Sequence, residues 1–193
     1  MSHTLLYVHG FASSGQSSKV EELKDILRCN VIAPDLQHRP MSDVAMLAQI
    51  ISTEHVATIV GSSLGGFYAL ILALQFKVNL ILINPSLSPH ITLQDQVGLV
   101  KNFKGGEFSW QMKQINELAV MVNSINPQVI KQSEIDLSHV LVLLAEQDQR
   151  LDYRDAVNLL HGAKIIIDQQ QNHRFSNIGI YADDIRNVAQ VRN

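Results

Sequence analysis

Residues 58–74 read TIVGSSLGGFYALILAL and join a strand, a sharp turn and a helix without a break. The run before Gly61 is typical of a strand, and the helix after it is apolar on every side, as buried helices are. Between them lies a G-x-S-x-G pattern centred on Ser63 rather than on Ser62. A serine on such a turn exposes its hydroxyl at the sheet edge, and the helix N-terminus behind it favours negative charge. The stretch therefore predicts an α/β fold with a nucleophilic serine at Ser63.

The rest of the chain repeats the alternation of strand and helix. Continuous apolar runs, rather than alternating ones, are typical of strands that are covered on both faces in a parallel sheet. The six runs expected as strands are Thr4–Val8, Asn30–Ala33, Ala57–Val60, Asn79–Ile83, Val140–Ala145 and Lys164–Ile167. Because helix-like stretches separate them, they predict an open, mostly parallel six-stranded sheet with right-handed crossovers and helices on both faces.

Helical periodicity marks the segments between the strands. Ser18 and Glu21 match a capping box, which predicts that the first helix starts near Ser18. A second helix is expected after Ser42 as its N-cap. Apolar residues line one face of this second helix and one face of the last helix. Those residues are Val44, Leu47 and Ile51, and then Ile178, Tyr181, Ile185 and Val188.

Residues 86–137 interrupt this rhythm, because they contain no strong strand. A structureless loop of that length is uncommon in a compact domain, so we expect a small helical cap insertion. Ile115, Leu118 and Val122 have the spacing of a helix within it. The sequence therefore predicts one domain, residues 1–193, that carries residues 86–137 as its cap.

The composition excludes several classes of protein. The 193 residues carry a net charge of −3 with 46% hydrophobic and 17% charged residues, so the chain can bury a core and lacks the basic face of a nucleic-acid binder. Its single cysteine, Cys29, excludes an intrachain disulfide and a multi-cysteine zinc site, and no His-x-x-x-His pair predicts a metal. The apolar runs are too short for a signal peptide or a membrane span, so a cytoplasmic protein is expected.

A serine hydroxyl needs a base, and the base needs a carboxylate to orient it. In this kind of turn the chain order is serine, acid, histidine, and His173 lies in a loop between a late strand and the last helix. The loop after Val140–Ala145 offers three carboxylates. Glu146 lies close to the strand end and Asp152 has the position of a helix N-cap. The expected acid is therefore Asp148, with Asp152 as the alternative.

Acyl transfer also needs backbone N–H groups that stabilise the oxyanion. The expected donors are Leu64, which follows the nucleophile, and Phe11, in the loop after the first strand. His9 is expected to shape that loop rather than to act as a base. The candidate residues of the substrate pocket lie on this loop and in the insertion. They are His9, Gly10, Phe103, Phe108 and Trp110.

Short motifs recur in a fixed order along nearly the whole chain. They are LYVHGF at 6–11, GSSLGGFYA at 61–69, Asn84-Pro85, LDYRDAV at 151–157 and NHRF at 172–175. Together they resemble the YqiA-like esterases, which are small bacterial α/β-hydrolases. The resemblance implies a minimal α/β-hydrolase fold and hydrolysis of an ester or thioester without a cofactor. By position it makes Ser63 the nucleophile, Asp148 the acid and His173 the base, in agreement with the chain order.

Two loops depart from the family pattern. The family tends to have glycine before its triad aspartate, where this chain has Gln147. It also tends to have Gly-Gly before Asn-His, where this chain has Gln170-Gln171. Because a side chain restricts φ, we expect the backbone to differ from the family in these two loops.

The sequence thus predicts a serine hydrolase, a carboxylesterase or thioesterase, that cleaves a small acyl ester or thioester through an acyl-enzyme. Two alternatives stay open. An acyltransferase with the same triad would pass the acyl group to an acceptor other than water. A non-catalytic module of hydrolase fold would bind a partner, and its Ser63 and His173 would lie beyond hydrogen-bond reach.

Overall fold

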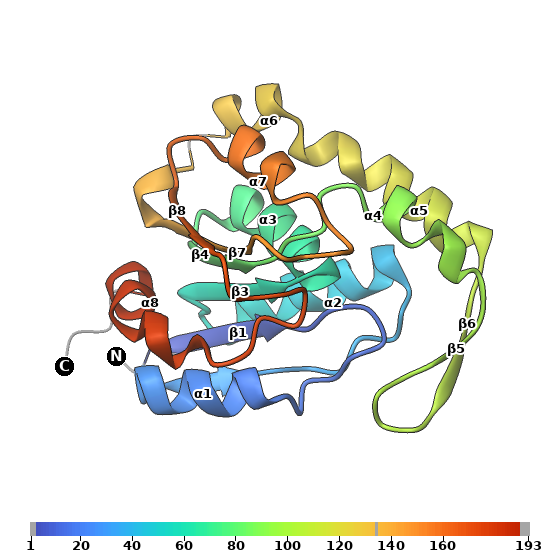
Figure 1. The fold of residues 1–193 in the computed structure, drawn as a ribbon, viewed down its shortest axis with the longest axis horizontal. Coiled ribbons are helices and arrows are strands. Elements are labelled where there is room, and N and C mark those ends of the chain that lie inside the picture. Colours follow the sequence, from blue (N-terminus) through green and yellow to red (C-terminus); the bar gives the residue numbers. More distant parts are fainter. Residues whose placement is uncertain (1–2, 134, 190–193) are drawn as a thin grey trace.

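The computed structural model describes residues 3–133 and 135–189, in which six parallel strands form a central sheet (Figure 1). Their order across the sheet is β2-β1-β3-β4-β7-β8. The strands are β1 (Thr4–Val8), β2 (Asn30–Ile32), β3 (Thr58–Ser62), β4 (Asn79–Ile83), β7 (Val140–Ala145) and β8 (Lys164–Asp168). Each matches one of the predicted runs to within two residues at either end. The predicted parallel α/β sheet is therefore confirmed.

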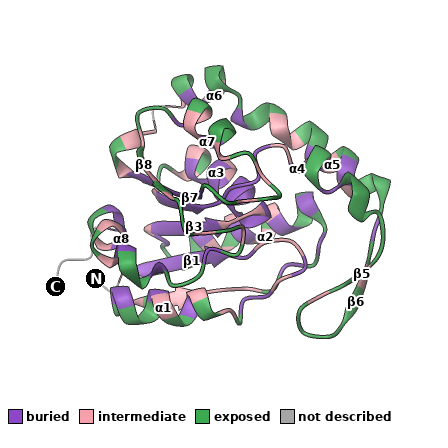
Figure 2. Ribbon diagram, in the orientation of Figure 1, coloured by how far each residue is buried: buried purple, intermediate pink, exposed green. Residues whose placement is uncertain are grey.

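The side chains of each strand alternate between two hydrophobic cores, one on either face of the sheet. In β1, Leu5 and Tyr7 enter one core while Leu6 and Val8 enter the other. Helices α1 (Ser18–Leu27) and α8 (Ala182–Ala189) cover the first face, and α2 (Pro40–Thr53), α3 (Leu64–Phe76) and α7 (Tyr153–Leu159) cover the second. Figure 2 shows buried strands inside and exposed residues on the outer sides of the helices. Burial on both faces explains why the strands are apolar throughout.

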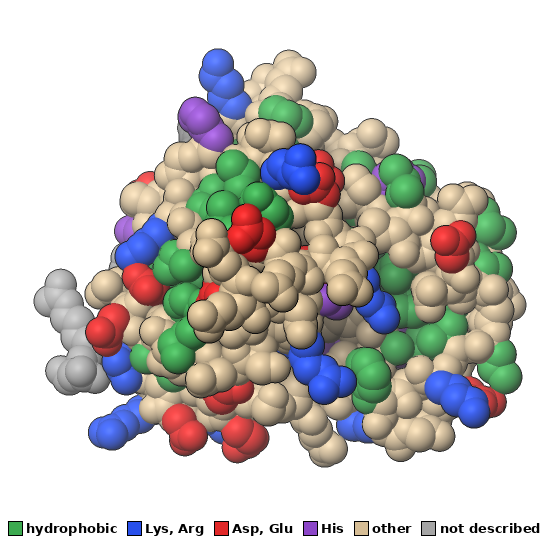
Figure 3. Space-filling view, in the orientation of Figure 1, with side chains coloured by type: hydrophobic (Ala, Val, Ile, Leu, Met, Phe, Trp, Pro, Cys, Tyr) green, Lys and Arg blue, Asp and Glu red, His purple; other side chains and the backbone are tan. Residues whose placement is uncertain are grey.

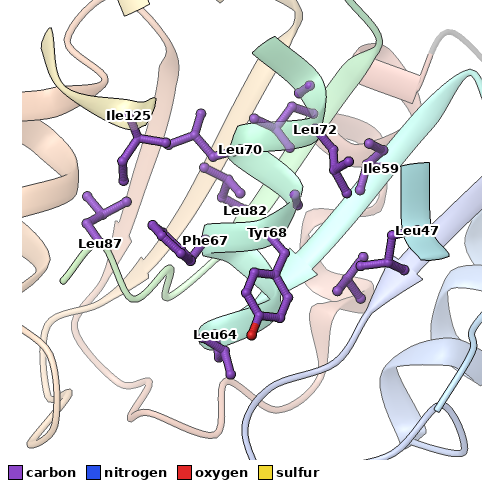
Figure 4. Close-up of a cluster of buried hydrophobic side chains, with 14 of the residues drawn as sticks. Leu47, Ile59, Leu64, Phe67, Tyr68, Leu70, Leu72, Leu82, Leu87 and Ile125 are labelled. Carbon is purple, nitrogen blue, oxygen red and sulfur yellow. The ribbon is translucent and has the colours of Figure 1, made fainter. Parts of the chain in front are cut away.

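Helix α3 is buried on several sides, as its all-round apolar sequence predicts (Figure 4). Gly65, the second residue of this helix, lies directly against β1. A Cβ at Gly65 would lie 2.1 Å from the Val8 carbonyl oxygen, so only glycine allows this approach. The side chains around the helix come from α2, the sheet and the insertion. Those labelled in Figure 4 are Leu64, Phe67, Tyr68, Leu70 and Leu72 of α3, with Leu47, Ile59, Leu82, Leu87 and Ile125 around them.

Helix α1 and the last helix lie where the sequence predicts them. Helix α1 starts at Ser18, and its N-cap Ser17 makes no side-chain capping hydrogen bond. The capping-box pattern thus located the helix start without forming the box. The last helix consists of a 3₁₀ turn at Ile178–Tyr181 followed by α8. The four predicted residues of its inner face are all buried.

Helix α2 starts at Pro40, so the predicted N-cap at Ser42 is wrong. The reason is Asp43, whose Oδ2 accepts a hydrogen bond from the Arg39 amide at 2.9 Å. Its Oδ1 accepts another from the Gln37 amide at 2.9 Å. These bonds satisfy amides at the start of the helix from inside its first turn, and proline suits the first helical position.

The insertion contains the expected helices and an antiparallel hairpin that the sequence did not predict. Its elements are α4 (Pro89–Thr92), β5 (Gly98–Lys101), β6 (Glu107–Trp110), α5 (Met112–Val122) and α6 (Pro127–Gln132), with 3₁₀ turns at 94–96, 123–125 and 137–139. Figure 1 shows the helices lying across the α2 and α3 side of the sheet, with the hairpin extending from one end. The cap is therefore part helix and part β-ribbon.

A specific turn closes the hairpin. Asn102 Oδ1 accepts hydrogen bonds from the amides of Lys104 at 3.0 Å and Gly106 at 2.9 Å. Gly105 has a φ of +84°, which glycine adopts without strain. Two short runs separated by a glycine-containing loop are a recognised hairpin pattern, and this was the overlooked signal.

Candidate active site

The loops after β1 and β3 meet where the strand order reverses. Strand β1 lies between β2 and β3, and the helices that follow β1 and β3 cover opposite faces of the sheet. A crevice at the carboxyl ends of the strands is expected at such a point. Gly10 borders it, since a Cβ there would lie 3.1 Å from the Cβ of Ser63 and 3.7 Å from its Oγ. Gly10 thus leaves room beside the serine hydroxyl.

Ser63 occupies a strained turn between β3 and α3. Its φ of 54° and ψ of −120° are rare for a residue with a side chain. Its amide donates to the Ile83 carbonyl at 3.0 Å, and its carbonyl accepts from the Ser86 amide at 3.0 Å. The end of β4 therefore holds the turn from both sides of the Ser63 residue.

Two hydrogen bonds connect Ser63, His173 and Asp148. The Ser63 Oγ lies 3.2 Å from His173 Nε2, and His173 Nδ1 lies 2.8 Å from Asp148 Oδ2. The side chain of Asp148 is 2% exposed and that of His173 is 26% exposed. Residues far apart along the chain thus meet in the predicted order, with the acid inside and the ring reachable from solvent.

Asp148 is held as a carboxylate. Burial acts to raise its pKa, but the hydrogen bond from His173 and those from the amides of Arg150 and Leu151 outweigh burial and lower it. Those amides donate to Asp148 Oδ1 at 2.8 Å and 3.1 Å. Because an ionised carboxylate only accepts, the proton between the two side chains belongs to His173 Nδ1. His173 Nε2 is then the acceptor for the Ser63 hydroxyl.

The alternative carboxylates lie elsewhere. Asp152 caps helix α7, where its Oδ1 accepts from the Arg154 amide at 3.0 Å. Glu146 is exposed, and its amide extends the sheet by donating to the Asp168 carbonyl at 2.9 Å. Of the three candidates, the structure brings Asp148 to His173.

The glutamines that replace family glycines tie the two loops together. The Gln147 amide donates to the Gln171 carbonyl at 3.2 Å, and Gln147 Nε2 donates to the Gln169 carbonyl at 2.6 Å. The Gln171 side chain forms two hydrogen bonds with the Ser176 backbone: its Nε2 donates to the carbonyl at 2.9 Å, and its Oε1 accepts from the amide at 3.0 Å. None of Gln147, Gln170 and Gln171 is among the described residues with positive φ. Glycine is therefore not required at these positions.

Of the two amides predicted to bind the oxyanion, one follows Ser63 in the chain and the other lies in the loop after β1. Leu64 is the first residue of α3, and Phe11 follows Gly10 in the loop after β1. Within residues 3–133 and 135–189, neither amide donates to another protein group. A Ser13–Gly10 backbone hydrogen bond of 3.2 Å closes the turn that carries Phe11.

His9 and Trp110 are fully buried, which corrects their prediction as pocket-lining residues. His9 Nδ1 contacts the Gly10 carbonyl at 2.8 Å, and its Nε2 accepts from the Leu36 amide at 3.0 Å, so the ring shapes the loop as predicted. Trp110 donates from Nε1 to the Leu93 carbonyl at 3.2 Å. Both rings therefore lie inside the molecule and support the loop after β1.

A cluster of four aromatic side chains joins the loop after β1 to the hairpin. Phe11 packs edge-on against Phe108 and Trp110, with ring centroids 5.5 Å and 4.9 Å apart. His38 stacks on Phe108 at 3.6 Å. The sequence assigned no function to His38, because its packing against Phe108 of the hairpin is seen only in the folded structure. Phe108 is half-buried and packs beside Phe11.

The tip of the hairpin docks beside the same loop. The Phe103 amide donates to the Ala12 carbonyl at 3.0 Å, while the Phe103 side chain is 79% exposed. Lys104 Nζ forms an ion pair of 2.7 Å with Asp35. Figure 3 shows hydrophobic side chains gathered over β5 and β6 on this side of the molecule. Phe103 thus lies beside the loop after β1 with its side chain directed to solvent.

A groove of about 360 Å³ lies between the insertion and α7. It starts at Leu87 and Ser88, directly after Ser86, which contacts the serine turn. Val122, Ile125 and Leu159 contribute to its apolar lining. The insertion therefore borders a groove that begins close to the residues that follow β4.

Nowhere in the part of the chain that the structure describes do three or more histidine, cysteine, aspartate or glutamate side chains gather in a way that could hold a metal ion. None of its helices has both the length and the apolar character that crossing a membrane requires.

Comparison with known proteins adds a family to this geometry. Residues 4–190 match the model of a family described as an uncharacterised protein family, UPF0227. The chain belongs to the UPF0227 family. A curated UPF0227 protein of Klebsiella pneumoniae subsp. pneumoniae is 26% identical over 185 residues, which cover 90% of this chain and 92% of that protein. The match agrees with the resemblance to the YqiA-like proteins.

Solved structures show the fold of this UPF0227 protein. Est1E from Butyrivibrio proteoclasticus with bound ferulic acid superposes with a TM-score of 0.70 at 13% identity, covering 96% of this chain and 87% of Est1E. The monoacylglycerol lipase of Paleococcus ferrophilus superposes with a TM-score of 0.70 at 14% identity, covering 98% and 95% of the two chains. The predicted α/β-hydrolase fold is therefore confirmed.

Proposed function

We propose that this protein is a serine hydrolase that cleaves small acyl esters or thioesters. The observation that carries the proposal is the pair of hydrogen bonds from Ser63 through His173 to Asp148. The first bond gives the serine proton a route to the imidazole, and the second keeps the ring in the tautomer that accepts it. The fold shared with Est1E, which holds ferulic acid, and with a monoacylglycerol lipase supports the same class of substrate.

In the first half-reaction, His173 Nε2 takes the hydroxyl proton of Ser63 as Oγ bonds to the acyl carbon. The carbonyl electrons move onto oxygen, where the amides of Phe11 and Leu64 donate to the oxyanion. One such donor can contribute ~2.7–4 kcal/mol to the transition state. The oxyanion then collapses, the bond to the alcohol or thiol breaks, and the leaving group takes the proton from Nε2. Asp148 stabilises the imidazolium throughout.

In the second half-reaction, water replaces the leaving group. His173 Nε2 takes a proton from water as its oxygen attacks the acyl carbon of the Ser63 ester. The second oxyanion collapses, the bond to Ser63 Oγ breaks, and Nε2 returns the proton to the serine. The products are the free acid and the original enzyme.

Both alternatives are less well supported than hydrolysis. A non-catalytic module is disfavoured because Ser63 Oγ and His173 Nε2 lie 3.2 Å apart. An acyltransferase would share the first half-reaction and differ in the acceptor. The His173 side chain is 26% exposed, which favours water as the molecule that it activates.

A fluorophosphonate probe and a short p-nitrophenyl ester test the proposal. The wild-type protein should be labelled and should release p-nitrophenol, and Ser63→Ala should lose both signals. Ser62→Ala is the matched control and should keep both. Equal labelling of the wild type and Ser63→Ala would refute the assignment. Added alcohols or amines that divert the product would indicate an acyltransferase instead.

A further inference from the structure

The residues at the end of strand β4 form hydrogen bonds with backbone groups close to each member of the proposed triad. Strand β4 lies between β3, which leads to Ser63, and β7, which leads to the Asp148 loop. Ile83, the last residue of β4, accepts the hydrogen bond from the Ser63 amide. The next residue, Asn84, faces the other two loops with its side chain. The proposed reaction gives no role to the Asn84-Pro85 motif.

The Asn84 side chain bridges the acid and base loops. Its Oδ1 accepts from the amide of Ala145 at 2.8 Å, and the Ala145 carbonyl accepts from the Asp148 amide at 3.4 Å. Its Nδ2 donates to the carbonyls of Asn172 at 3.1 Å and His173 at 3.2 Å. One buried amide thus fixes the end of β7 and the backbone of the base itself.

The chemistry of these contacts specifies asparagine. The N–H of Ala145 requires an acceptor, and the two carbonyls require donors, so the amide has one orientation. Asn84 is 3% exposed, which keeps water from replacing these bonds. Aspartate would have the same shape but would direct an oxygen at two carbonyl oxygens. The site therefore selects the amide and not only its size.

The backbone conformation of Asn84 offers a simpler explanation for the residue. Its φ is 43°, in the left-handed region where asparagine is favoured over most other residues. Conformation alone, however, would be served equally well by glycine. Glycine at this position therefore separates the role of the side chain from the role of the backbone.

We propose that Asn84 is the positioning residue that holds the His173 ring within reach of the Ser63 hydroxyl. It touches neither the ring nor the reacting atoms, and it acts through the Asn172 and His173 carbonyls. Lys19 assists from α1, since its Nζ donates to the next carbonyl, that of Arg174, at 2.7 Å. A misplacement of 1 Å can cost ~10²-fold in rate, and that is the effect expected on losing these bonds. The proposal rests on the proposed function.

The test compares Asn84→Asp and Asn84→Gly with the wild type. Asn84→Asp keeps the acceptor for Ala145 and removes the donors, whereas Asn84→Gly keeps the backbone conformation and removes the side chain. The matched control is Asn79→Asp, the same change at the other end of β4. Folding is checked by circular dichroism, and active sites are counted by fluorophosphonate titration. Both Asn84 variants should lose ~10²-fold in kcat per titrated site with KM within about threefold, and the control should match the wild type.

A purely structural role would lower the unfolding temperature or the number of titrated sites without changing kcat per site. Wild-type kcat per site in Asn84→Asp would therefore overturn the proposal. If Asn84→Asp does not fold, Asn84→Gly decides by the same measurement.

A second readout does not depend on activity. The proton between His173 Nδ1 and Asp148 should give a low-field NMR signal in the wild type and in Asn79→Asp. The proposal expects Asn84→Asp to lose this signal, and its persistence would overturn the proposal. If the wild type hydrolyses no ester, the proposed function fails, and the NMR comparison still decides whether Asn84 positions the ring.

Discussion

The loops after β7 and β8 are joined by hydrogen bonds, whereas the loop after β1 is joined to the insertion mainly by aromatic rings. On the first side, Asn84, Gln147 and Gln171 satisfy specific backbone groups at defined distances. On the second side, Phe11 and Phe108 belong to an aromatic cluster whose rings pack edge-on or stacked. In the proposed reaction, the polar side would therefore fix the geometry of proton transfer, and the aromatic side would border the space for the substrate.

The largest effect is expected on the polar side, from Asp148→Asn. The amide removes the charge that stabilises the imidazolium and favours the wrong tautomer of His173, so kcat should fall by ~10³–10⁴-fold. Steady-state hydrolysis of a short ester, normalised to titrated sites, measures the loss. Asp152→Asn is the matched control: it should keep kcat within about threefold while losing about 1 kcal/mol of stability with the α7 cap. An Asp148→Asn variant with more than a tenth of wild-type kcat would contradict the role proposed for the polar side in proton transfer.

An intermediate effect is expected on the aromatic side, in the pH dependence of stability. Burial, and then the nearby His9, lower the pKa of His38 to about 4, against a partly opposing attraction from Asp35. The unfolded chain binds a proton near pH 6.5, so the contribution of His38 to stability is complete above pH 6.5 and falls as the pH drops toward 4. His38→Asn should reduce the difference in unfolding free energy between pH 7 and pH 4.5 by about 2 kcal/mol.

Denaturant unfolding at the two pH values measures this difference. The control is His55→Asn, because His55 is an exposed histidine that also has a positive φ, of 50°. The difference that it shows between the two pH values is the reference for that of His38→Asn. The same difference in His38→Asn as in the wild type would mean that the ring stacked on Phe108 is not protected from protonation.

The smallest effect is expected from the ion pair at the hairpin tip. Lys104 and Asp35 are 39% and 59% exposed, so solvent screens their attraction. Lys104→Met should change the unfolding free energy by less than ~1 kcal/mol and kcat by less than about twofold. Lys101→Met, on the same hairpin, is the comparison. A loss above ~2 kcal/mol in Lys104→Met alone would show that charge, and not ring packing, holds the hairpin.

The sequence predicted the polar side better than the aromatic side. Ser63 and Asp148 follow buried strands and His173 follows the edge strand β8. Because parallel strands end at the same edge of the sheet, apolar runs and short motifs were sufficient to group them. The hairpin was missed because its strands are short and largely exposed, which leaves little hydrophobic pattern. His9 and Trp110 were misplaced because sequence alone does not tell a wall of a pocket from its buried support.

The bonding of Asn84 could not be derived from the sequence either. Its side chain bonds to three backbone groups, one at the end of β7 and two in the loop after β8. These groups come together only when the chain has folded. The glutamines that replace family glycines are a similar case. Their residue type indicated only a restricted backbone. The structure reveals that their side chains make hydrogen bonds that glycine, which has no side chain, could not make.

The hairpin has one more consequence, for redesign of the molecule. In the part of the chain described, its tip contacts the loops after β1 and β2 and not the loops that carry Asp148 and His173. Ribbons of other lengths grafted between Val97 and Gln111 should therefore alter which compounds are accepted, provided that they keep Phe108 and Trp110 packed against Phe11. Selectivity and turnover can then be optimised in separate rounds of engineering.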